Sequence, residues 1–176
     1  MSSKQNLQVT PSNHTSTGTI SYRDGNPLIQ FIIGEQERML VGQSVRLVGK
    51  FSCFKNASKD VPATSDSLRM SEQLGIFSII DSLTIKSQAT HQVIEEIRHF
   101  PRFMASYLPT TSSLEDYSGH LGQQVLVTPN HNAQTTGVVS KGDGSFCIPL
   151  PCGLFNGQNP IPLMANGAGG VGGILV

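Results

Sequence analysis

The sequence has no tryptophan, only three cysteines and no net charge, because 12 lysines and arginines balance 12 aspartates and glutamates. A protein that binds nucleic acid through its phosphates needs an excess of basic residues, so direct binding of a genome is not expected. An odd number of cysteines without a CxxC pair argues against a disulfide framework or a zinc ribbon. We interpret Cys53, Cys147 and Cys152 as reduced thiols, and the pattern leaves the exposure of Cys147 and Cys152 open.

No apolar run approaches the roughly 18 residues that a membrane-spanning helix needs, so no transmembrane segment is predicted. The first residues, MSSKQNLQVT, lack the apolar core of a secretory signal. Residues 1–18 are polar, with Lys4 as their one basic residue, and we expect a flexible arm that contacts a neighbouring protein or stays disordered. Residues 19–176 are long enough for one domain with its own core.

Apolar residues that alternate with polar ones, or form short β-branched runs, predict strands in the first half of the chain. The predicted strands are 28–33, 44–54, 76–87 and 91–98, with a hairpin at 87–90 and a long polar loop at 55–75. The side chains expected to point inward are Val45, Leu47, Phe51, Cys53, Phe77, Ile79, Leu83, Ile85, Val93 and Ile97.

One helix of about two turns is predicted to begin at Pro101 and to end at Pro109. Shorter strands are predicted at 124–128, 136–140 and 145–150, and a glycine-rich loop at 165–173 leads to a final apolar stretch at 174–176. Because this stretch is expected to be exposed, the sequence suggests a truncated chain or a strand completed by residues that follow. Many short strands, one brief helix and no βαβ alternation predict an all-β sandwich or barrel.

Three stretches have a wider likeness: Pro27–Phe54, Ile76–Leu108 and Ser145–Val176, which cover roughly half of the chain. The second reads IFSIIDSLTIKSQATHQVIEEIRHFPRFMASYL, and the third contains Pro-Leu, Gly-Leu-Phe and a second Pro-Leu before a glycine-led strand. In this order they resemble the first jelly roll of double-jelly-roll major capsid proteins of large DNA viruses, virophages and Polinton-like viruses. The resemblance implies a jelly-roll β-sandwich, incomplete if the chain is truncated.

Members of that family carry a second jelly roll, which this sequence lacks. The resemblance therefore implies either an N-terminal fragment of a major capsid protein or a single-jelly-roll relative, such as a minor capsid or vertex protein. The expected function is that of a structural protein of the virion, assembled in the host cell cytoplasm or nucleus into an icosahedral capsid. The expected partners are copies of the chain itself, as a homotrimer or higher homo-oligomer, and other capsid proteins.

The alternative is a β-sandwich binding module, such as a spike or carbohydrate-binding attachment protein. Such modules stack sugars on exposed aromatic rings, and three tyrosines without a tryptophan argue against it. An enzyme is not expected, because a cupin-like site needs histidines and carboxylates clustered on neighbouring strands. No catalytic, cofactor-binding or metal-ligating residue is predicted.

Residues 167–172 contain GxGxxG, but no strand precedes it and no helix follows, so we interpret it as a loop. Glu95 and Glu96 would face opposite sides of a strand and could not share a proton. His91 and His99 would lie about 26 Å apart at 3.3 Å per residue, too far to bind one metal ion.

The remaining patterns are weaker. His120 and His131 fall in predicted loops without nearby ligands of suitable spacing. No hydrolase signature surrounds any of the three cysteines. The stripe formed by Phe100, Phe103 and Tyr107 is either a surface for interaction or the buried face of the helix, and the second reading is favoured.

Overall fold

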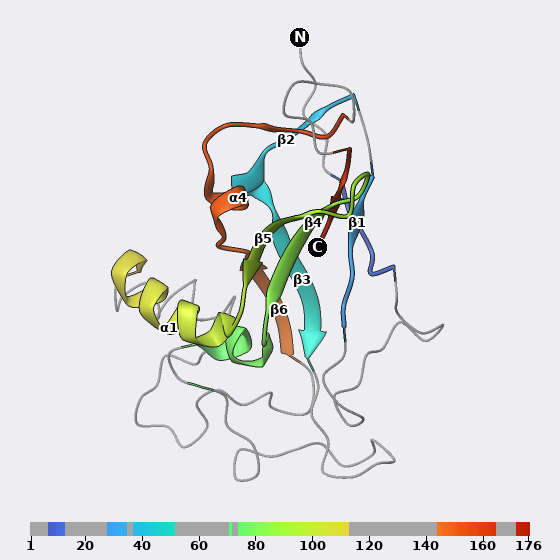
Figure 1. Ribbon diagram of the computed structural model, residues 1–176. Coiled ribbons are helices and arrows are strands. Elements are labelled where there is room, and N and C mark those ends of the chain that lie inside the picture. Colours follow the sequence, from blue (N-terminus) through green and yellow to red (C-terminus); the bar gives the residue numbers. More distant parts are fainter. Residues whose placement is uncertain are drawn as a thin grey trace, which may run out of the picture. The chain divides into compact units, whose positions relative to one another are not determined.

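A computed structural model covers the chain, and its described residues are 7–12, 28–34, 37–51, 71, 74–112, 144–164 and 172–176. These residues form short antiparallel strands and one α-helix of 12 residues, together with three shorter helical segments (Figure 1). The strands are β1 (Ile32–Ile33), β2 (Met39–Leu40), β3 (Arg46–Phe51), β4 (Leu83–Ser87), β5 (Val93–Ile97), β6 (Gly144–Pro149), β7 (Ile161–Pro162) and β8 (Ile174–Leu175). The helices are η2 (Gly42–Ser44) and η3 (Gly75–Ile79), both 3-10, and α1 (Phe100–Thr111) and α4 (Gly153–Asn156).

The strands pair in a nested order, in which β1 pairs with β8, β2 with β7, β3 with β6 and β4 with β5. Ile32 and Leu40 are eight residues apart in sequence, whereas their pairing partners, Leu175 and Ile161, are 14 residues apart. Leu40 and Arg46 are six residues apart, whereas their partners, Ile161 and Pro149, are 12 residues apart. The connections between β6, β7 and β8 are thus longer than those between β1, β2 and β3. Helix α4 forms part of the connection between β6 and β7.

The chain divides into two compact units, of which unit 1 comprises residues 1–42, 84–96 and 157–176. Its four-stranded sheet has the order β1-β8-β4-β5, and β2 and β7 form a separate pair. Strand β8 therefore lies between β1 and β4, and Phe31 and Val176 exchange backbone hydrogen bonds of 2.8 and 2.9 Å beside it (Figure 1). The buried side chains of this unit include Ile33, Ile85, Ile161, Leu163 and Ile174.

Unit 2 comprises residues 43–83 and 97–156. It contains the six-residue ladder between β3 and β6, and α1 packs against η3. Phe100, Met104 and Leu108 form a buried stripe along α1 at intervals of four residues, as expected for one face of an α-helix. The Phe100 ring lies 6.2 Å from that of Phe77 in η3, and the Phe100 N–H donates a hydrogen bond to the Asp81 carbonyl.

The structure confirms the strand-rich prediction, and β3, β4, β5 and β6 lie within or overlap predicted strands. Residues 76–79 were predicted as part of a strand, which is wrong, because they belong to η3. Ile76 and Phe77 are adjacent and both buried, which alternation on a strand does not allow, and Gly75 begins the turn with a φ of 52°. Val93 was predicted to point inward, but its side chain is 54% exposed.

The end of the predicted helix is also wrong, since α1 runs past Pro109 to Thr111. Proline removes the backbone hydrogen bond to the carbonyl four residues earlier. The last turn nevertheless persists because Leu108 is buried and the Ser112 N–H donates to the Leu108 carbonyl. The hydroxyls of Thr110 and Thr111 both donate to the Tyr107 carbonyl, at 2.7 and 3.0 Å.

The final apolar stretch was expected to be exposed, but Ile174 is fully buried and β8 is paired on both sides. The suggestion that the chain is truncated remains a prediction. Sequence patterns also missed α4 and the two-residue strands β2 and β7. The loop at 55–75 lies almost entirely outside the described residues, and the strands at 124–128 and 136–140 lie wholly outside them. Among the described helices, none has the length and apolar character needed to cross a membrane.

Candidate functional site

The histidines and carboxylates considered in the sequence do not converge in the described part of the chain. His91 and His99 lie at opposite ends of β5, both exposed and both with a φ of 56°, which is uncommon for residues other than glycine. Glu95 is half-buried and Glu96 is exposed, as expected for neighbours on a strand. The described residues include no group of three or more His, Cys, Asp or Glu side chains that could hold a metal ion. His120 and His131 lie outside them.

The glycine-rich segment is described only from Gly172 onward. Gly172 and Gly173 have φ values of 60° and 88°, in the left-handed region that glycine adopts without strain. They lead directly into β8, so a strand follows the GxGxxG pattern, as the sequence indicated. A pyrophosphate site needs a helix N-terminus at that position, and this segment does not supply one.

The two described cysteines are free thiols in different environments. Cys147 is half-buried on β6, whereas Cys152 is buried just before α4. The Cys152 sulfur accepts a hydrogen bond of 3.4 Å from the Phe155 N–H, so this thiol takes part in the first turn of α4. Cys53 lies outside the described residues.

The aromatic stripe of α1 is largely a packing surface. Phe100 is buried, and Phe103 and Tyr107 are half-buried with ring centroids 5.5 Å apart. The Tyr107 hydroxyl accepts a hydrogen bond of 3.3 Å from the Asn156 side chain. A small pocket of about 190 Å³ opens beside this stripe. Its walls are Phe77, Met104, Tyr107, Leu108, Thr111, Ser112, Pro149, Pro151 and Asn156.

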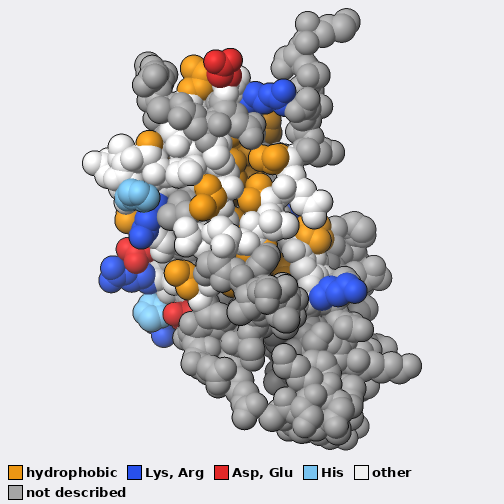
Figure 2. Space-filling model, turned by 90° about the vertical axis from the view of Figure 1, so that its right-hand side faces the viewer, with side chains coloured by type: hydrophobic (Ala, Val, Ile, Leu, Met, Phe, Trp, Pro, Cys, Tyr) orange, Lys and Arg blue, Asp and Glu red, His pale blue; other side chains and the backbone are white. Residues whose placement is uncertain are grey.

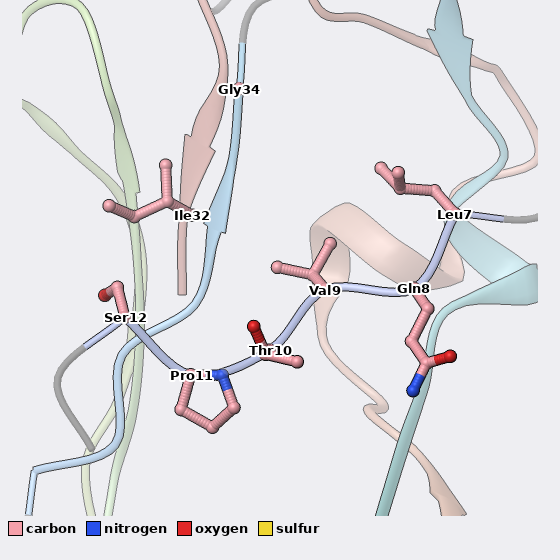
Figure 3. A pocket seen from close by; sticks show the side chains of 8 residues that line it. All are labelled: Leu7, Gln8, Val9, Thr10, Pro11, Ser12, Ile32 and Gly34. Atoms are coloured by element: carbon pink, nitrogen blue, oxygen red, sulfur yellow. The ribbon is translucent and has the colours of Figure 1, made fainter. Parts of the chain in front are cut away.

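A larger hollow of about 450 Å³ lies between residues 7–12 and strand β1 (Figure 3). Its other walls are Ile32 and Gly34. Figure 3 shows residues 7–12 as an extended segment in which Leu7 and Val9 point to one side and Gln8 to the other. Val9 and Pro11 are half-buried, whereas the other side chains of this segment, including Leu7, are exposed.

Ser12 attaches this segment to the chain just before β1. Its N–H donates to the Gln30 carbonyl at 2.7 Å, and its hydroxyl donates to the same oxygen at 3.1 Å. Residues 7–12 fall within the predicted arm 1–18, and the boundary of that arm at residue 18 stays a prediction, because residues 13–27 lie outside the described part. The alternation of Leu7, Val9 and Pro11 is a signal that could have located the segment in the sequence.

Large hydrophobic side chains are exposed mainly in unit 1. The most exposed are Leu28 at 76% and Met39 at 67%, and Val48, at 71%, is the one large exposed hydrophobic side chain described in unit 2. Figure 2 shows hydrophobic side chains at the surface in several places on one face of the molecule. The others in unit 1 are Leu7, Ile29, Ile32, Val41, Val93, Ile94 and Met164.

Comparisons with known proteins found no matching family model, no matching curated protein and no matching solved structure. The fold and the exposed surfaces therefore carry the argument about function. Two surfaces stand out in the described part: the edge of β1 beside residues 7–12, and the exposed apolar side chains of unit 1.

Proposed function

We propose that this chain is a structural subunit of a viral capsid, in which a jelly-roll β-sandwich assembles with copies of itself into an icosahedral shell. The nested strand pairing carries the proposal. A jelly roll is an antiparallel ribbon of eight strands that coils into two facing sheets. Its first strand pairs with its last, its second with its seventh, and so on inward. The pairs β1·β8, β2·β7, β3·β6 and β4·β5 have this order.

The position of β8 gives a second line of support. When such a ribbon coils, the last strand comes to lie between the first strand and an inner strand. In unit 1, Leu175 pairs with Ile32 on one side and with Lys86 on the other. Strand β8 thus lies between the first strand and an inner strand, and the facing of two complete sheets is part of the proposal.

The step from fold to shell rests on the resemblance in the sequence and on analogy, because lectins and cupins also use jelly rolls. Two properties of this chain support self-association. Most of its exposed large hydrophobic side chains belong to unit 1, and such side chains are available for contacts between copies. Its formal charge of zero gives little net repulsion between copies.

The partners in this proposal are copies of the chain, as trimers or higher assemblies, together with other capsid proteins. The location is the virion. The chain acts either as part of a major capsid protein or as a single-jelly-roll minor capsid or vertex protein. In all cases its sheets serve as a rigid body whose sides contact neighbours, and modest contacts suffice because symmetry repeats them.

Electron microscopy and light scattering of the purified protein test the proposal. We expect trimers or larger closed assemblies. Replacing both Leu28 and Met39 by Asp should weaken association, because charges would enter the apolar surface of unit 1. The matched control is Val48→Asp, which places a charge at a similarly exposed position in unit 2.

A protein that stays monomeric at high concentration and forms no particles would overturn the capsid assignment. Selective binding on a glycan array by such a monomer would support the alternative of a carbohydrate-binding attachment module.

A further inference from the structure

The outer edge of β1 is the end of the four-stranded sheet in unit 1. Backbone groups in a strand point alternately to its two sides. Phe31 bonds to Val176, so its groups face the β8 side, and the groups of Gln30 and Ile32 face the outer edge. The Ser12 N–H already reaches the Gln30 carbonyl on that edge, as a neighbouring strand would.

The contact between residues 7–12 and β1 is only partly formed. Within the described part of the chain, no hydrogen bond joins residues 7–11 to β1, and the two bonds from Ser12 to the Gln30 carbonyl hold the segment. From Ser12 toward Leu7 the segment diverges from β1, and the hollow of about 450 Å³ lies between the segment and the strand (Figure 3). Such an edge is a template for an added strand.

We infer that residues 7–12 are an exchangeable strand, which docks on the β1 edge of a second copy of the chain. The segment has features of an added strand: it is extended, and Leu7 and Val9 point to one side while Gln8 points to the other (Figure 3). Exchange recreates the same contacts with the second copy, so it costs little in binding energy.

The connection is long enough for exchange. Residues 13–27 separate the segment from the residues that precede β1, and fifteen residues span up to about 50 Å when extended. In an assembly of copies the neighbour's β1 edge is at a high local concentration, so weak docking in each subunit adds up to a strong link. The inference takes its partner, a second copy, from the proposed self-assembly.

Isotope mixing distinguishes exchange from docking within one chain. A variant with both Ser12→Cys and Gln30→Cys is made with ¹⁴N and with ¹⁵N, and the two forms are mixed unfolded, refolded together and treated with a short bismaleimide cross-linker. Trypsin cuts after Arg23, so the two introduced thiols fall in separate peptides, and mass spectrometry identifies the linked pair despite the native cysteines. Complete exchange gives about half of the pairs in mixed ¹⁴N/¹⁵N form.

Linked pairs of a single isotope only would overturn the inference, because each segment would then dock on its own chain. A lack of any 12–30 link would also overturn it, because Ser12 would not lie beside Gln30. In the same background, Val9→Asp should lower the mixed fraction by about tenfold, since it charges the side that faces the protein. Thr10→Asp, on the exposed side, should change it by less than about twofold.

Electron microscopy of the same samples separates this inference from the capsid proposal. Shell particles with single-isotope links would overturn strand exchange and leave the capsid function in place. Mixed links in small discrete oligomers, without particles, would support exchange and count against the shell. Equal mixed fractions for Val9→Asp and Thr10→Asp would contradict docking through the side of the segment that carries Val9.

Discussion

Gly49 on β3 lies opposite Phe146 on β6, and the ring of Phe146 covers it. A Cβ atom at Gly49 would lie 2.7 Å from Cζ and 3.1 Å from Cε1 of that ring, closer than carbon atoms pack. We expect Gly49→Ala to lower the free energy of unfolding by about 1–3 kcal/mol, because the ring must move off its position. Urea denaturation of the variant and the parent measures the change.

The matched control is Gly34→Ala, because no atom lies within 4 Å of the position that its Cβ would take. It should change stability by less than about 0.5 kcal/mol. Adding Phe146→Leu to Gly49→Ala should recover part of the loss by removing the tip of the ring. Equal effects of the two alanine substitutions would contradict the close approach of Phe146 to Gly49.

At the scale of the element, helix α1 is held in place by its buried stripe. Met104 is completely buried at the centre of this stripe. Met104→Ala should lower the free energy of unfolding by about 2–5 kcal/mol, since it removes buried methylene groups and leaves a cavity. Arg102→Ala, at an exposed position of the same helix, should cost less than about 0.5 kcal/mol. Thermal unfolding compares the two, and similar melting temperatures would show that the stripe does not anchor the helix.

Strand β8 lies between β1 and β4 in its sheet. A charged side chain in β8 should therefore weaken the pairing of β8 with both strands. Ile174 is fully buried, and Ile174→Asp should cost several kcal/mol because the carboxylate is removed from water. Three backbone amides form hydrogen bonds next to β8 and should lose protection from hydrogen exchange in this variant. They belong to Phe31, Gln88 and Val176.

Val93→Asp is the control for this experiment, because Val93 belongs to β5 of the same sheet but is 54% exposed. It should leave the exchange rates of those amides nearly unchanged. Unchanged protection in Ile174→Asp would mean that β8 is not required to hold β1 and β4 together.

At the scale of the whole molecule, the balance of 12 basic and 12 acidic residues limits the partners of the chain. Nucleic acid binding gains free energy when lysines and arginines neutralise phosphates and release counterions, and this chain has no excess of those residues. Fluorescence anisotropy with duplex and single-stranded DNA should therefore give a Kd weaker than about 10⁻⁴ M at physiological salt. Tighter binding that falls steeply with added salt would show a basic surface that the overall balance conceals.

Local patterns predicted the elements whose side chains follow a regular period. Strands β3, β4 and β6 lie where alternation or short apolar runs placed strands, and α1 lies where apolar residues recur at helical spacing. The same patterns failed at η3 and at Pro109. At η3 the adjacent residues Ile76 and Phe77 are both buried, and at Pro109 the buried Leu108 and the hydroxyl bonds to the Tyr107 carbonyl accompany the last helical turn.

The candidate surfaces were harder to predict from the chain alone. Polar composition indicated an arm before residue 19, but the docking of residues 7–12 beside β1 depends on Gln30. The sequence indicated correctly that Glu95 and Glu96 lie on different sides of a strand. It left the exposure of Cys147 and Cys152 open, and the structure makes the first half-buried and the second buried.

Composition and periodicity by themselves determined that this chain is rich in short strands, carries one main helix and has no net charge, because these properties depend on residues close together in sequence. Only the tertiary structure decided which strands pair. Strands β1 and β8 pair although they lie more than a hundred residues apart in sequence, and such pairing depends on which apolar surfaces can be buried together. The same long-range choice buried Ile174 and left the outer edge of β1 beside residues 7–12.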